Sequence, residues 1–188
     1  MSERLFALIS NLGPTSDQLK EAITNKLKFA AVPKKHKILR VGEVCDYLYF
    51  VEKGLLRAYY ERDGQDTSNW FMMENDFLIS VRSFYQRVKS YEVIEALEEC
   101  ELYFIHYDDL MDLYERHPEF NVIARKLTEY YYGISEERSF IMRGHQAKKK
   151  YIFLMENYSE IIKRVPVKHI ASYLGISSDT LSRIRASI

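Results

Sequence analysis

Residues 165–185 read VPVKHIASYLGISSDTLSRIR, and this stretch decides how the rest of the chain is interpreted. Ile170 and Leu174 lie four residues apart, which places both on one face of a helix. Gly175 follows at once, where a helix C-terminus favours a residue that can adopt a positive φ. Ser177 can then cap a second helix. Two short helices joined by a tight glycine turn predict a helix-turn-helix.

The second helix of this motif would bury Leu181 and Ile184 and expose its polar residues. Exposed hydroxyl, carboxylate and guanidinium groups can contact base edges in a DNA groove. Helix–glycine–helix hairpins also occur in all-α proteins that never bind DNA, so the spacing by itself leaves both interpretations open. The residues that would face outward are Ser178, Asp179, Ser182, Arg183 and Arg185.

The distribution of charge favours DNA binding. Residues 143–188 contain nine Lys or Arg and three acidic residues, a net charge of +6. Because the whole chain has 27 basic and 27 acidic residues, residues 1–142 carry a net charge of −6. A basic terminal module on an acidic body is typical of nucleic-acid binding by the terminal module.

The composition predicts a folded, non-enzymatic protein. Of the 188 residues, 47% are hydrophobic and 14% aromatic, which suffices for a real core. A basic leader and an apolar run of about 18 residues are both missing, so we expect a cytoplasmic protein without a membrane segment. Cys45 and Cys100 lie far apart, outside any CxxC pair, so we expect reduced thiols and no metal or other cofactor. His36 and His106 are isolated, unlike the clustered ligands of a cupin-type metalloenzyme, so we expect no enzymatic activity.

The first two thirds of the chain change from helical to strand-like spacing. Residues 3–28 have helical spacing, whereas short aromatic and β-branched segments follow from Ile38 to Tyr107. Asp63-Gly64 favours a hairpin turn between two of them. Strands at this spacing predict an antiparallel sandwich or barrel, whose aromatic side chains would either line a ligand cavity or simply fill the interior. The seven segments are KILRV, YLYFVEKG, LLRAYYER, TSNWFMME, DFLI, YEVIEAL and ELYFIHY.

A long amphipathic helix is predicted from Pro118 to Arg143. Its apolar residues recur every three or four positions, which suits a coiled-coil seam with a second copy of the chain. The alternative is that this stripe packs only on the chain's own barrel. Beyond the long helix, Gly144 is expected to act as a hinge, and Ala147 to Lys163 are expected to form another helix. The expected dimerisation residues are Phe120, Ile123, Leu127, Tyr130, Tyr131 and Ile134.

This order of parts resembles the Crp/Fnr superfamily of bacterial transcription regulators. GEVCDYLYFVEKGLLRAYYERDGQDTSNWFMMENDFL, from Gly42 to Leu78, looks like the family's cyclic-nucleotide-binding-like barrel, and Ile170 to Arg185 is similar to its DNA-reading motif. The resemblance implies an α+β fold with a jelly-roll-like sensor barrel at residues 1–117, a dimerisation helix at 118–143 and a helix-turn-helix domain at 144–188. It also implies a homodimer on an inverted-repeat site in double-stranded DNA, an unidentified small-molecule effector, and RNA polymerase as a candidate partner.

One departure from the family pattern concerns the effector. Family members that bind cyclic AMP have a cassette that begins with Gly-Glu-Leu and ends with Arg-Ser or Arg-Thr. The Glu accepts from the ribose hydroxyl and the Arg pairs with the cyclic phosphate. Here Ile79-Ser80 replaces the Gly-Glu pair and Ser90-Tyr91 replaces the Arg-Ser pair. We therefore expect that the barrel does not bind cyclic AMP and that it senses either another small molecule or none.

The resemblance also implies which residues contact bases. Matched position by position, Ser178, Asp179 and Arg183 would face base edges, with the Arg183 guanidinium suited to guanine O6 and N7. Asp179 would alternatively be only a favourable charge at a helix N-terminus. Ser177 and Thr180 would cap the helix or contact phosphate. The complete expected DNA-binding set is Lys168, Ser177, Ser178, Asp179, Thr180, Ser182, Arg183 and Arg185.

Overall fold

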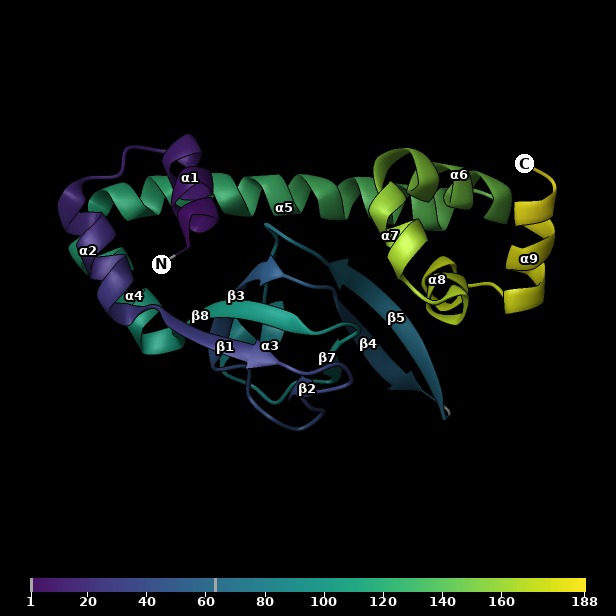
Figure 1. Ribbon diagram of the computed structural model, residues 1–188, viewed down its shortest axis with the longest axis horizontal. Coiled ribbons are helices and arrows are strands. Elements are labelled where there is room, and N and C mark those ends of the chain that lie inside the picture. Colours follow the sequence, from purple (N-terminus) through teal and green to yellow (C-terminus); the bar gives the residue numbers. More distant parts are fainter. Residues whose placement is uncertain (1, 63) are drawn as a thin grey trace.

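The computed structural model describes residues 2–62 and 64–188, and it has the α+β architecture that the sequence predicts. A barrel of antiparallel strands lies beneath the long helix α5, and the C-terminal helices gather at one end (Figure 1). The strands are β1 (Lys28–Val32), β2 (Lys37–Leu39), β3 (Tyr47–Lys53), β4 (Leu56–Arg62), β5 (Gln65–Met72), β6 (Phe77–Leu78), β7 (Glu92–Ala96) and β8 (Cys100–His106). The helices are α1 (Glu3–Leu12), α2 (Asp17–Lys26), α3 (Val81–Gln86), α4 (Tyr107–Arg116), α5 (Pro118–Gly144), α6 (Ala147–Asn157), α7 (Ser159–Arg164), α8 (Val167–Leu174) and α9 (Ser178–Ala186).

The described strands form two four-stranded antiparallel sheets, in the orders β1-β8-β3-β6 and β2-β7-β4-β5. The hairpin expected around Asp63-Gly64 is present in the pairing of β4 with β5, which runs from Leu56 opposite Met72 to Arg62 opposite Gln65. Asp63 itself lies outside the described residues, and Gly64 has the positive φ of 75° that such a turn requires. The predicted barrel of paired strands is therefore confirmed.

Strand β1 is an element that the sequence pattern missed. Lys28 was expected to end a helical segment, but α2 ends at Lys26 and β1 begins two residues later. All five residues of β1 pair with β8, from Lys28 opposite Phe104 to Val32 opposite Cys100. Three of its five residues, Lys28, Ala30 and Ala31, are of types depleted in strands, so the pairing with β8 supports this strand.

The helices also differ from the sequence pattern at two places. The helix expected from Ala147 to Lys163 is broken at Tyr158, whose φ of −138° ends α6 before α7 begins. Gly144, expected as a hinge beyond the long helix, is the last residue of α5. Neither change alters the order of the elements.

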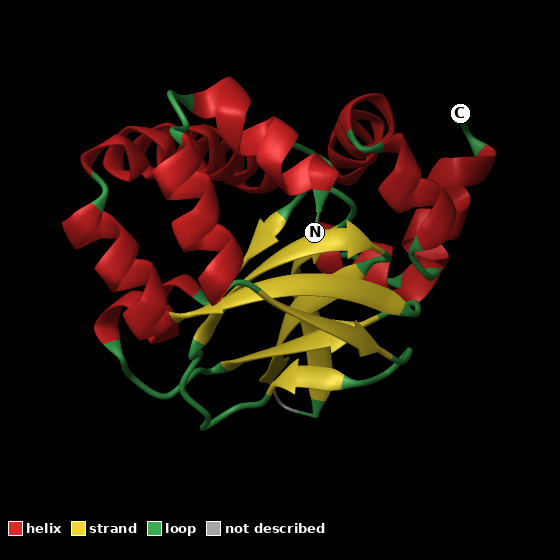
Figure 2. Cartoon of the chain, turned by 60° about the vertical axis from the view of Figure 1, so that its left-hand side comes forward, coloured by secondary structure: helices red, strands yellow, loops and turns green. Residues whose placement is uncertain are grey.

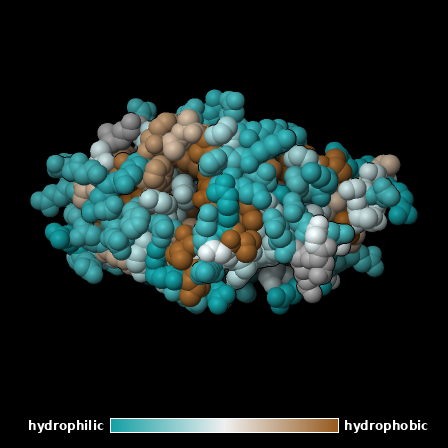
Figure 3. Space-filling view, turned by 90° about the horizontal axis from the view of Figure 1, so that it is seen from below, coloured by the Kyte–Doolittle hydropathy of each residue, from teal (hydrophilic) through white to brown (hydrophobic). Residues whose placement is uncertain are grey.

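Two clusters of buried hydrophobic residues hold the molecule together. One lies between the two sheets, α1, α2, α4 and the start of α5. The other joins the C-terminal helices to Leu55, Phe71 and Leu97 of the barrel. Figure 2 shows the helices along one side of the strands. The face seen in Figure 3 is mostly hydrophilic, with hydrophobic groups visible near its middle.

Candidate nucleic-acid interface and effector cavity

The helix-turn-helix geometry follows from its glycine and its serine. Gly175 ends α8 in the left-handed region at φ 69°, and its amide donates back to the α8 carbonyls of Ala171 and Ser172. Ser177 then caps α9, because its Oγ accepts from the Thr180 amide at 3.1 Å. These two contacts set the angle at which α9 leaves α8.

Helix α9 packs on α6 and α8 and lies at the outer end of the molecule (Figure 1). Leu181 is buried beneath it, as expected. Of the expected DNA-binding residues, only Thr180 is half-buried, and its hydroxyl lies 2.9 Å from that of Ser177. The exposed ones are Lys168, Ser177, Ser178, Asp179, Ser182, Arg183 and Arg185.

The charged groups of α9 are free of intramolecular partners in the part of the chain that the structure describes. Asp179 and Arg183 lie four residues apart on the helix but make no ion pair with each other there. Arg183 and Arg185 therefore present unpaired guanidinium groups to solvent. This arrangement offers cations to an anionic surface without first breaking a salt bridge.

A polar contact attaches α8 to the barrel. His169 of α8 lies with its Nδ1 2.5 Å from Nη1 of Arg57, a strand residue that is 1% exposed. Arg57 also donates to Asp66 at 2.9 Å and to Glu95 at 3.2 Å. Ser172 of α8 accepts from the Ser68 amide at 2.9 Å. Sequence reasoning missed this contact, because nothing in LLRAYYER shows which partner a buried arginine will meet.

A second ion-pair group joins α7 to the same end of the barrel. Arg164 donates to Glu74 at 2.7 Å and to Glu98 at 2.6 Å. Burial works to raise the pKa of Glu74, but the hydrogen bonds from Arg164 and from the Gly54 amide outweigh it and lower that pKa to about 2. One of the nine basic residues of the terminal module is therefore turned toward the barrel rather than toward a partner.

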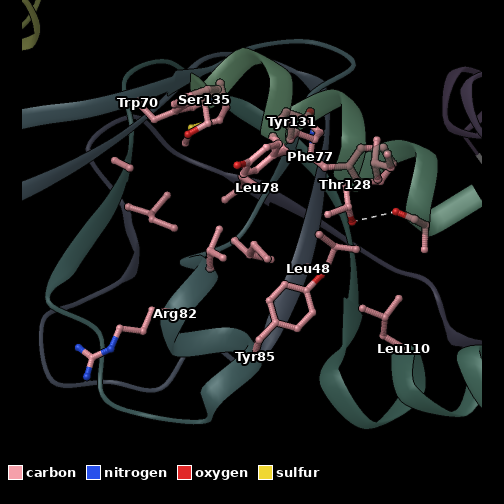
Figure 4. A pocket seen from close by; sticks show the side chains of 18 of the residues that line it. Leu48, Trp70, Phe77, Leu78, Arg82, Tyr85, Leu110, Thr128, Tyr131 and Ser135 are labelled. Carbon is pink, nitrogen blue, oxygen red and sulfur yellow. Dashed lines mark hydrogen bonds between the residues drawn. The ribbon is translucent and has the colours of Figure 1, made fainter. Parts of the chain in front are cut away.

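A cavity of about 540 Å³ lies between the barrel and α5 (Figure 4). This volume is in the usual range for small-molecule sites. Apolar and aromatic side chains from both sheets, α1, α3, α4 and α5 make up most of the wall. The aromatic residues of the barrel thus line a cavity as well as filling the core. Figure 4 shows Trp70, Phe77, Tyr131 and Tyr85 around it.

The segment that corresponds to the cyclic-nucleotide cassette has no free charge at its two key positions. Ser80 and Ser90 are buried, with their hydroxyl oxygens 3.3 Å apart. Arg87 is held by an ion pair to Asp46 and donates to the Cys45 carbonyl at 2.8 Å. A guanidinium fixed in this way is not available to a phosphate.

The structure corrects part of the expected dimerisation face. Phe120 and Ile123 are 8% and 2% exposed because they lie in the core between α5 and the barrel, so they cannot face a partner. The Tyr131 hydroxyl is engaged within its own chain, where its oxygen accepts a hydrogen bond from the Phe77 amide at 2.7 Å. Leu127 lines the cavity. Of the six expected residues, Tyr130 is exposed and Ile134 is half-buried.

Comparisons with known proteins agree with this architecture. Residues 30–117 match the family model described as the cyclic nucleotide-binding domain. The global regulator CLP of Xanthomonas campestris has a TM-score of 0.68 at 16% identity, over 92% of this chain and 91% of that one. A protein of Eubacterium rectale described as a Crp/Fnr-family transcriptional regulator gives 0.66 at 21% identity, over 90% and 81%. The chain has the Crp/Fnr fold. The catabolite activator protein of Thermus thermophilus shares that fold as well, with a TM-score of 0.57 at 18% identity over 96% and 85%.

One curated relative matches part of the chain. It is the voltage-gated inwardly rectifying potassium channel KCNH2 of Oryctolagus cuniculus, 29% identical over 110 residues, which are 58% of this chain and 9% of the channel. The chain thus spans about a tenth of the length of that relative. Among the described residues of this protein, each helix is too short or too polar to span a bilayer.

Proposed function

We propose that this protein is a dimeric transcription regulator that binds specific sequences of double-stranded DNA through α9. The observation that carries the proposal is the exposed polar face of α9, where Arg183 and Arg185 have no intramolecular ion-pair partner among the described residues. The rest of the terminal unit adds to its positive charge.

The alternative is a ligand-binding barrel whose terminal helices only pack. The docking of α8 on β5 fits that alternative, but α9 contacts α6 and α8 and leaves its own polar face free. In the proposed regulator the two functions are divided between the helices: α8 contacts the barrel and α9 contacts DNA.

The test is binding to a duplex obtained by selection from random double-stranded DNA, measured by fluorescence anisotropy. We expect the affinity to fall by a factor of ten or more between about 50 and 200 mM salt, because basic side chains release counterions when they neutralise phosphates. Arg125→Ala removes an exposed cation of α5 outside the terminal unit and is the control. Absence of duplex binding at low salt, or affinity that is flat with salt, contradicts the proposal.

Base recognition by Asp179 is tested on the same duplex. If its carboxylate accepts from a cytosine amine, Asp179→Ala relaxes the preference at one position of each half-site, while binding to unrelated DNA holds or rises. If Asp179 only stabilises the N-terminus of α9, the variant keeps the wild-type sequence preference and loses a few tenths of a kcal/mol of stability.

We further propose that the barrel does not bind cyclic AMP. The buried Ser80–Ser90 pair and the fixed Arg87 support this, because the cassette positions offer neither the Glu that would accept from the ribose nor the Arg that would pair with the phosphate. Each unpaired polar group costs about 1–3 kcal/mol. Calorimetric titration should detect no binding, and a micromolar dissociation constant refutes the proposal.

A further inference from the structure

Two arginines lie on the wall of the cavity without a carboxylate partner. Among the described residues, neither Arg82 nor Arg138 has an acidic oxygen within ion-pair distance, whereas Arg57, Arg87 and Arg164 each do. Glu92 also lines the cavity, but it accepts from the Asn69 amide group at 3.0 Å. The cavity therefore has two cations for one acid.

Arg138 is the better placed of the two cations. Its guanidinium carbon lies 4.7 Å from the ring centroids of both Trp70 and Tyr173. It donates to the Asn69 side-chain oxygen at 3.1 Å and to the Tyr173 hydroxyl, and because a guanidinium has five N–H donors, others remain for an anion. Figure 4 shows Arg82 at the edge of the cavity, with its guanidinium directed away from Leu48 and Tyr131. Arg82 thus lies at the mouth.

Most of the rest of the wall is apolar. The half-buried Arg138 guanidinium is stabilised by the faces of Trp70 and Tyr173, but among the described residues no carboxylate neutralises its charge, so it can still pair with an anion in the cavity. The apolar residues of the wall include Leu48, Met72, Phe77, Leu78, Ile79 and Leu127.

We propose that the cavity binds a small apolar molecule with one anionic group, and that Arg138 pairs with this group while the hydrocarbon part lies against β3, β5, β6 and α5. A cavity of about 540 Å³ holds two or three fused or linked aromatic rings. Such a ligand would pair with Arg138 and would need neither the Glu nor the Arg of the cyclic-AMP cassette. This agrees with the presence of Ser80 and Ser90 at those two positions.

Arg138 also connects the cavity to the helix-turn-helix. Tyr173, on which its guanidinium lies, belongs to α8 and packs on Phe71 of β5 with ring centroids 5.3 Å apart. An anion that draws Arg138 into the cavity weakens its contacts with Tyr173 and Asn69, and so loosens α8 on β5. This regulatory consequence rests on the proposed function, whereas the binding itself does not.

The test of binding uses a charged probe and its uncharged counterpart. The probes are 1-anilinonaphthalene-8-sulfonate and N-phenyl-1-naphthylamine, which differ by the sulfonate. Trp70 is the one tryptophan of the chain and lines the cavity, so energy transfer from it reports occupancy. We expect the sulfonate to bind the wild type more tightly, and Arg138→Gln to weaken its binding about tenfold or more. Binding of the uncharged probe should change less than twofold.

Two further variants keep this test decisive. Arg138→Lys retains the charge and should recover most of the sulfonate affinity, which separates loss of charge from loss of folding. Arg125→Gln removes an arginine of the same helix that pairs with Glu129 outside the cavity and should leave both affinities unchanged. Equal affinity of the wild type for both probes, or unchanged sulfonate affinity in Arg138→Gln, overturns the proposal.

The connection to α8 is tested by hydrogen–deuterium exchange without DNA. We expect the sulfonate to speed exchange of the amides of residues 167–174 in the wild type but not in Arg138→Gln. Unchanged exchange in the wild type at saturating probe overturns the regulatory part. Since neither measurement contains DNA, failure of DNA binding would refute the proposed function while leaving the ligand proposal intact.

Discussion

His169→Gln is the substitution that tests how the helix-turn-helix is held on the barrel. His169 is 9% exposed, and its Nδ1 accepts from Arg57 Nη1 only while the ring is neutral. Burial, followed by the charges of Arg57 and Lys168, lowers its pKa from 6.5 to about 4, against an opposing effect of Asp66. The contact therefore requires that His169 remain unprotonated.

The pH dependence of stability follows from this lowered pKa. Between pH 6.5 and pH 4 the unfolded chain binds a proton at His169 that the folded chain does not, so the free energy of unfolding falls as the pH falls. A pKa of about 4 against 6.5 corresponds to a loss of about 2 kcal/mol between pH 6.5 and 4.5. Below pH 4 both states are protonated and this contribution is gone.

Urea denaturation of the wild type and His169→Gln at several pH values measures the effect. Only the wild type carries this protonation at residue 169. The free energy of unfolding of the wild type minus that of His169→Gln should therefore decrease by about 2 kcal/mol from pH 6.5 to 4.5. His36→Gln, at an exposed histidine, is the control for removing an imidazole elsewhere. A difference between wild type and His169→Gln that does not vary with pH refutes the reasoning.

Three further outcomes are expected. Gly54 has φ 103°, and an added Cβ would lie 2.6 Å from a cysteine sulfur, so Gly54→Ala should lower the free energy of unfolding by about 2–4 kcal/mol in urea denaturation. Gly42→Ala, where φ is 88° but no atom lies within 4 Å, should cost about 1 kcal/mol, and equal costs would show that the clash does not matter. Arg183→Ala should weaken binding to the selected duplex by about 1–3 kcal/mol and relax one base preference, and an unchanged preference would remove Arg183 from base recognition. Tyr130 is 59% exposed on α5, so Tyr130→Glu combined with Ile134→Glu should give monomers in sedimentation, whereas a wild type that is already monomeric at micromolar concentration would rule out the dimer.

The structure differs most clearly from the sequence-based prediction along α5. The apolar spacing from residue 118 onward shows that one side of the helix must be covered, but it does not show by what. Phe120 and Ile123 are covered by the chain's own barrel, while Tyr130 is left exposed. Intramolecular and intermolecular burial produce the same periodicity, because both require an apolar stripe.

Local signals by themselves determined the helix-turn-helix. The capping serine Ser177, the glycine Gly175 and the buried Leu181 act within a few residues of one another, so their effect is independent of the rest of the molecule. The strand segments with aromatic and β-branched residues were likewise recognisable, whereas β1 formed only because β8 offers it a partner.

Only the tertiary structure decided the contacts between distant segments. Arg57 meets His169 across 112 positions, and Arg138 lies between Trp70 of β5 and Tyr173 of α8. Side chains of this kind have no periodic pattern, and their pairing depends on how α5 positions the terminal helices against the barrel. The sequence thus determined what each element is, through short-range capping and periodicity, and the fold decided which charges meet and where a cavity remains, because those depend on packing between elements.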